Sequence, residues 1–428
     1  MTRLIANPLF LFLAVWTGAT SLYLTGVYTG TFPAPEPRTL PLVLLSVATF
    51  SLGYLTWTLL QGLRPGAGVP LLPTQPLTRE RIARVLRLCL LMGVIALLLV
   101  LYRIALIASR YNTSILDLLT QPEMLRLRLV LFIGRDVYQT SHMVILISLT
   151  SGLFSIGFVL LGVFLYVGTT AAKYFYLGAF LALSLAIGLL NLSRYEVTVN
   201  ILYLILAYCL TYAADRHRRL WRILPDLLLP LAAVLGLYIA IDVLLRKGLT
   251  YGRTGQVQGF LFSLYWYAAS PLAAFNDWLS TFRGGYDLGQ NTFFPLFKWF
   301  YRLHLVAEPD VSVYGEIIRI PYAANVYTYL RNFYEDFGIL GVALGPYLLG
   351  WLTAAVRPRA GRCFHYLNLY VVLLVFILLS FYNYFLFSNQ IYLQILFGFL
   401  FFRYELTSGH ERIPCEQAAD ESAVLYSR

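Results

Sequence analysis

Long apolar runs separated by short polar connectors dominate the pattern along the chain. The runs 88–102, 144–168 and 366–387 approach or exceed the ~20 apolar residues that a helix needs to cross a ~30 Å hydrocarbon core. A membrane β-barrel would alternate apolar and polar residues in shorter strands, so helices are the expected spanning elements. The pattern predicts about ten spans, near residues 8–28, 40–62, 84–108, 143–167, 174–191, 197–213, 223–245, 323–354, 364–387 and 389–404.

Composition and charge agree with an all-α polytopic membrane protein. The chain is 59% hydrophobic and only 12% charged, a much more apolar balance than that of ordinary soluble domains. The net charge of +11 does not indicate nucleic-acid binding, because most of it lies in short connectors at the ends of spans. The basic connectors 64–87, 215–222 and 357–362 are placed in the cytoplasm by the positive-inside rule.

These signals divide the chain into four parts. The predicted parts are transmembrane helices 1–7 over residues 1–245, a large external loop over 246–322, transmembrane helices 8–10 over 323–404, and a polar cytoplasmic tail over 405–428. None of the four cysteines falls in a predicted external loop, so we expect no disulfide framework.

The external segments contain arginines and lack metal-binding motifs. Neither an HExxH sequence nor a Cys/His set with metal spacing occurs, so the sequence predicts no bound metal. Guanidinium groups bind phosphate through paired charge-assisted hydrogen bonds, and this pattern is typical of a metal-free diphosphate site. The alternative role is anchoring to lipid headgroups. The candidate arginines are Arg194, Arg253, Arg283, Arg319 and Arg331.

The stretch "NVYTYLRNFYEDFGILGVALGPYLLGWL" (325–352) has a polar beginning and an apolar end. In a helix, Tyr327, Arg331 and Tyr334 share one face and would present a site outside the membrane. An ion pair between Arg331 and Glu335 at the water boundary is the structural alternative. We expect the following glycines to let another span approach closely: Gly338, Gly341 and Gly345.

This stretch resembles the Wzy-type polymerases of oligosaccharide repeat units, which build bacterial O-antigens and related polysaccharides. The matching residues are Asn325, Tyr327, Thr328, Tyr334, Asp336, Phe337 and Gly338, together with the "SRYE" turn that contains Arg194. The resemblance implies a GT-C-like glycosyltransferase of the bacterial inner membrane with its site facing the periplasm. It would join repeat units carried on undecaprenyl diphosphate, without a cofactor or metal, in contact with membrane lipid and a chain-length regulator protein. Asn325, Tyr327 and Tyr334 would then contact substrate.

The resemblance leaves the catalytic base and the neighbouring functions open. A base is needed if the anomeric carbon inverts, and the nearby choices are Asp336, Glu316 and His304. A transporter or lipid flippase, or an O-antigen ligase, would also suit about ten spans with arginines near the membrane. Transporters usually carry inverted repeats, whereas this chain concentrates its polar residues in one late loop, and this favours an enzyme.

Overall fold

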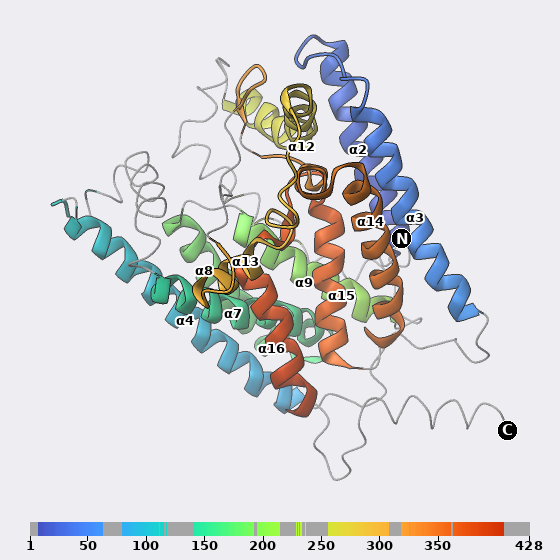
Figure 1. Ribbon diagram of the computed structural model, residues 1–428. Coiled ribbons are helices and arrows are strands. Elements are labelled where there is room, and N and C mark those ends of the chain that lie inside the picture. The colour runs from blue at the N-terminus through green and yellow to red at the C-terminus, as the bar shows by residue number, and fades with distance from the viewer. Residues whose placement is uncertain are drawn as a thin grey trace.

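The computed structural model is a bundle of long helices. It describes residues 7–62, 79–110, 112–114, 117, 141–191, 195–214, 228, 230, 232, 236, 256–307, 318–324, 326–360 and 363–405. The long helices are α2 (Pro8–Tyr28), α3 (Thr39–Gly62), α4 (Arg79–Arg110), α7 (Ser141–Val167), α8 (Thr170–Leu190), α9 (Tyr195–Ala214), α12 (Gln256–Thr281), α14 (Tyr329–Ala360), α15 (Phe364–Leu379) and α16 (Asn389–Glu405). In Figure 1, α2, α3 and α14 run along one side of the bundle and α4, α7 and α8 along the other, with α9 and α15 between them.

Apolar length confirms that the protein is a polytopic helical membrane protein. Within the described residues, six helices are long and apolar enough to span a bilayer: α2, α3, α4, α7, α8 and α14. The predicted spans at 197–213 and 364–387 coincide with shorter apolar helices, Tyr195–Thr211 and Phe364–Leu379. The predicted span at 223–245 lies outside the described residues, apart from four isolated positions. The count of ten spans stays a prediction.

Several element boundaries differ from the predicted ones. α15 ends at Leu379, and a turn followed by the short 3-10 helix η2 (Phe385–Phe387) leads into α16. The side chain of Ser380 donates a hydrogen bond to the carbonyl of Ile377 and so helps to end α15. Residues 318–324, expected to be loop and helix, contain the antiparallel strands β1 (Ile318–Arg319) and β2 (Ala323–Ala324). Within the described residues, this two-residue pairing is the only β structure.

The segment predicted as a large external loop contains two helices. They are the 26-residue α12 and the nine-residue α13 (Phe294–Arg302). α12 lies at the end of the bundle where α14 begins and packs against α2 (Figure 1). The predicted tail lies outside the described residues beyond Glu405.

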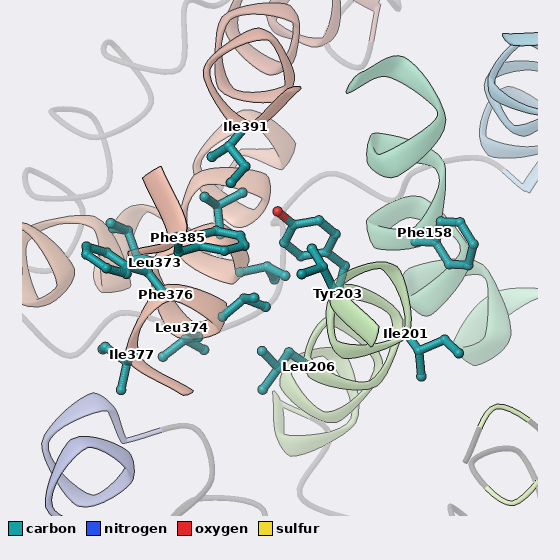
Figure 2. Packing of buried hydrophobic residues seen from close by; sticks show 14 of the residues in the cluster. Phe158, Ile201, Tyr203, Leu206, Leu373, Leu374, Phe376, Ile377, Phe385 and Ile391 are labelled. Carbon is teal, nitrogen blue, oxygen red and sulfur yellow. The ribbon is translucent and has the colours of Figure 1, made fainter. Parts of the chain in front are cut away.

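Apolar side chains from helices distant in sequence form the centre of the bundle. Figure 2 shows Ile201 of α9 on the side of α7 and its Phe158, while Tyr203 of α9 lies toward Phe385 and α15. The rings of Tyr203 and Phe385 are 6.4 Å apart, and both side chains are buried. α9 therefore connects the two sides of the bundle.

α3 and α14 approach each other through glycine. A Cβ atom on Gly53 would lie 2.0 Å from the carbonyl oxygen of Tyr347, and one on Gly350 would lie 2.3 Å from that of Phe50. Each glycine therefore faces backbone of the opposite helix and not a movable side chain. Small residues at such positions let membrane helices pack at short range.

A kink at Gly338 divides α14 into two parts. Gly338 has φ 62° and ψ −146°, a conformation open to glycine, and Figure 1 shows the first turns of α14 at an angle to the rest of the helix. The prediction that Gly338, Gly341 and Gly345 admit another span is wrong. A Cβ atom on Gly341 would meet the carbonyl oxygen of Phe333 at 2.1 Å, and one on Gly345 would meet the Phe333 ring, so these glycines accommodate the kink.

The cysteines differ from expectation at one position. Cys89 and Cys209 are free and buried, but Cys363 is disulfide-bonded. The expectation was based on external loops alone, whereas Cys363 lies in the short connection between the end of α14 and the beginning of α15.

Candidate functional site

Hydrogen bonds link the beginning of α14 to α3 and to the end of α15, and α2 is joined to them through Ser380. The amide of Tyr329 donates to the carbonyl of Ser380 at 3.0 Å, and the Tyr329 hydroxyl is 2.5 Å from that of Ser46 on α3. The indole of Trp16 on α2 donates to the Ser380 hydroxyl at 3.0 Å. These side chains are buried. The polar first turns of α14 are therefore fixed relative to α2, α3 and α15.

Arg331 lies among aromatic rings in the first turn of α14. Its guanidinium carbon is 4.1 Å from the centre of the Tyr327 ring and 5.2 Å from that of Trp278 on α12. Its Nε atom is 3.4 Å from Oε2 of Glu335 and makes no hydrogen bond. The Arg331 side chain is only 12% exposed and that of Glu335 20%. A cation so shielded from water attracts an anion more strongly than a surface arginine does.

Tyr334 extends this group of rings toward the end of α12. Its ring is 6.1 Å from Trp278 and 5.7 Å from Phe282, in edge-on geometry at both contacts. We call Trp278, Tyr327, Arg331, Tyr334 and Glu335 the arginine–aromatic cluster. Trp278, Tyr327 and Tyr334 are buried, whereas Arg331 and Glu335 keep 12% and 20% of their side-chain surface exposed.

Asn276 holds α12 against the connection between α2 and α3. Its side-chain oxygen accepts hydrogen bonds from the Glu36 amide at 2.6 Å and the Thr39 hydroxyl at 2.7 Å. Its side-chain nitrogen donates to the carbonyl of Ala34 at 3.3 Å. This buried amide therefore positions Trp278, half a helical turn further along α12.

Arg38 of the same connection lies beside the cluster. It donates to the carbonyl of Leu279 at 3.1 Å and pairs with Glu36 at 2.9 Å. The hydrogen bond with Glu36 raises the pKa of Arg38, and the Tyr334 hydroxyl raises it further. Desolvation acts to raise the pKa of Glu36, but hydrogen bonds from the Arg38 amide and guanidinium and the charge of Arg38 outweigh it and lower that pKa. Arg38 is therefore a second cation within reach of Tyr334.

Asp336 anchors the glycine-rich loop 282–293 to α14. Its Oδ1 accepts hydrogen bonds from the amide and the side chain of Asn291, at 3.0 and 3.2 Å, and its Oδ2 accepts one from the amide of Thr292 at 2.5 Å. The Asn291 side chain also donates to Asp287 at 2.8 Å. Asp336 is fully buried, so its charge is balanced by donors of the loop.

The structure brings some predicted site residues together and leaves others apart. Tyr327, Arg331 and Tyr334 belong to the cluster, and Asp336 lies next to it in sequence. Arg283, Arg319 and His304 are exposed, and no side-chain hydrogen bond or ion pair among the described residues joins them to it. His304 follows α13 in a left-handed conformation with φ 58°. Four further predicted residues lie outside the described residues: Arg194, Arg253, Glu316 and Asn325.

Trp278 and Arg38 were not predicted. Trp278 is one of many aromatic residues in its segment, and no local pattern distinguishes it. Arg38 carried a usable signal, because it lies in the short "PAPEPR" connector that the span order places on the external side. The positive-inside rule predicts few arginines in external connectors, so an arginine at this position indicates a role other than setting topology.

Two further observations bear on the site: the arrangement of possible metal ligands, and the similarity of the chain to known proteins. Across the part of the chain that the structure describes, no three His, Cys, Asp or Glu residues lie together as metal ligands would. No family model, no curated protein and no solved structure matches this chain.

Proposed function

We propose that this chain is a glycosyltransferase of the bacterial inner membrane that polymerises oligosaccharide repeat units carried on undecaprenyl diphosphate. One observation carries the proposal: Arg331 lies between two aromatic rings, shielded from water, at the end of a membrane span. A guanidinium in such surroundings supports binding of the diphosphate of a lipid-linked substrate, because arginine binds phosphate through paired charge-assisted hydrogen bonds. The buried rings of Tyr327 and Trp278 hold the guanidinium of Arg331 in place. The proposal includes a ten-span, GT-C-like architecture.

An assay with purified protein in liposomes tests the proposal. The substrate is the lipid-linked repeat unit extracted from cells that lack this protein. We expect a ladder of products that differ by one repeat unit. Transfer to lipid A would indicate a ligase, and movement of the unit across the bilayer without a new glycosidic bond would indicate a transporter. Either result would contradict the proposal.

The same assay tests the prediction of metal independence. The charge of the departing diphosphate must be neutralised, by a metal or by fixed donors such as Arg331. We expect excess EDTA to leave the rate of ladder formation close to that of untreated protein. Loss of activity that Mg²⁺ or Mn²⁺ restores would show that a metal, and not Arg331, neutralises the charge of the departing diphosphate.

The proposed location requires the cluster to face the periplasm. The basic connectors place the opposite helix ends in the cytoplasm, but a disulfide at Cys363 is typical of an oxidising compartment. We give more weight to the connectors, because three separate segments agree. In a background without native cysteines, we expect an impermeant thiol reagent to label Ser280→Cys on intact cells and Thr170→Cys only after permeabilisation. Reversed labelling would place the cluster in the cytoplasm.

A further inference from the structure

Three acidic residues lie near the kink of α14, but they do not form a group that could hold a metal ion, and their surroundings differ. Asp336 and Glu335 are adjacent in α14, and Asp287 lies on the loop that covers the kink. The loop is also tied to the backbone here, because the amide of Asp287 donates to the carbonyl of Glu335 at 3.2 Å. A proton acceptor for a sugar hydroxyl must have an oxygen within reach of substrate, so these surroundings decide which acid can serve.

Asp336 does not meet this condition. Both of its oxygens accept hydrogen bonds from backbone amides of the loop, and the residue has no exposed surface. Moving this carboxylate would leave the buried amides of Asn291 and Thr292 without an acceptor, and protonating it would weaken the hydrogen bond at the protonated oxygen. Its hydrogen bonds hold the loop against α14, so its role is to position the loop.

Glu335 has a different environment. Its side chain is 20% exposed, and its partner is the guanidinium of Arg331 at 3.4 Å. The charged groups within electrostatic reach are Arg331 and Asp336 on α14 and Asp287 on the loop. Arg331 is itself fixed by the rings of Tyr327 and Trp278, so it holds the partly exposed Glu335 carboxylate beside the guanidinium to which the proposed function assigns the diphosphate.

We propose that Glu335 is the proton acceptor of the transfer reaction, held in place by Arg331. This inference rests on the proposed function. In the step, the oxygen of the acceptor hydroxyl forms a bond to the anomeric carbon of the donor. The bond from that carbon to the diphosphate oxygen breaks, and its electron pair leaves with the diphosphate. The hydroxyl proton passes to Glu335, so one displacement with inversion accounts for all atoms and charges.

Initial rates of ladder formation across a range of pH test the assignment. We expect Glu335→Gln to lower the rate by about 10²-fold or more, since general base catalysis contributes roughly 10²–10⁴-fold. Binding of the extracted lipid-linked repeat unit, measured by native mass spectrometry, should stay within about threefold of wild type, because the amide keeps the shape of the side chain. The wild-type rate should fall at acid pH as a carboxylate is protonated, and the residual rate of Glu335→Gln should lack this fall.

Matched variants separate catalysis from folding. The control is Glu80→Gln, the same change at an exposed residue in the first turn of α4. The basic connectors predict that this end of α4 lies on the other side of the membrane from the cluster, so the variant should keep the wild-type rate. Asp336→Asn should lower the melting temperature and keep the fall in rate at acid pH. If Glu335→Gln also lowers the melting temperature, Glu335→Asp decides: a slower rate with normal binding supports the assignment, and the wild-type rate contradicts it.

The outcomes also separate this inference from the proposed function. If wild-type protein forms ladders and Glu335→Gln does so within about tenfold of its rate, Glu335 is not the proton acceptor and the proposed function stands. If wild-type protein forms no ladder, the function and the assignment both fail.

Discussion

Arg331→Lys is expected to reduce ladder formation by about 10²-fold, a loss comparable to removing one fixed donor to a developing negative charge. Lysine keeps the positive charge but loses the planar group that lies against Tyr327 and Trp278, and it cannot bind phosphate through two parallel hydrogen bonds. It also places its ammonium differently relative to Glu335. Initial rates with the extracted lipid-linked repeat unit, at equal amounts of folded protein, measure the effect.

α14 supplies a control at its other end. Arg359 also lies over a tyrosine, with its guanidinium carbon 5.9 Å from the centre of the Tyr366 ring, and it donates to the carbonyl of Ala355. Arg359→Lys should leave the rate near that of wild type. Equal rates for Arg331→Lys and wild type would reduce Arg331 to an anchor at the membrane boundary.

Gly53→Ala is expected to destabilise the protein by about 3 kcal/mol or more, the upper range for overpacking a core. The added methyl group would lie 2.0 Å from the Tyr347 carbonyl oxygen and 2.8 Å from its carbonyl carbon, so α3 and α14 would have to separate. Separation would also disturb the hydrogen bond between Ser46 and Tyr329 that helps to fix the beginning of α14. Thermal unfolding of detergent-purified protein, followed by size-exclusion chromatography, should show a lower melting temperature and a lower yield.

Gly178 of α8 provides the matching control. A Cβ atom there meets nothing within 4 Å. Because alanine is favoured over glycine in a helix by about 1 kcal/mol, Gly178→Ala should equal or exceed wild type in stability. If Gly53→Ala is as stable as Gly178→Ala, the close approach of α3 and α14 is wrong.

The sequence predicted the elements that apolar length defines. α2, α3, α4, α7 and α8 fall near their predicted ranges, because a run of about twenty apolar residues has few other uses. α12 was not predicted as a helix. Its many aromatic and polar residues give no long apolar run, and Pro271 lies inside it. The end of α15 at Leu379 depends on contacts with Trp16 and Tyr329, which local pattern does not contain.

The candidate site was predicted only in part, because a local sequence pattern can group only residues that lie close together along the chain. Arg331, Tyr327 and Tyr334 lie close together in sequence, and their spacing was enough to group them. Trp278 and Arg38 join them from distant segments, through packing that only the folded chain defines. Asp336 shows a further limit, since a carboxylate in a motif can serve chemistry or structure. Its bonds to loop amides, which sequence does not reveal, indicate structure.

The attachment of the loop 282–293 to Asp336 affects how the sequence of this site could change during evolution. Two of the three donors to its carboxylate are backbone amides, which every residue except proline possesses. The exposed side chains of Tyr286 and Leu288 can therefore change without loss of those two bonds. Under the proposed function, such substitutions would alter the surface next to the site while Arg331 and its rings stay in place, so a new glycan specificity would not need a new fold.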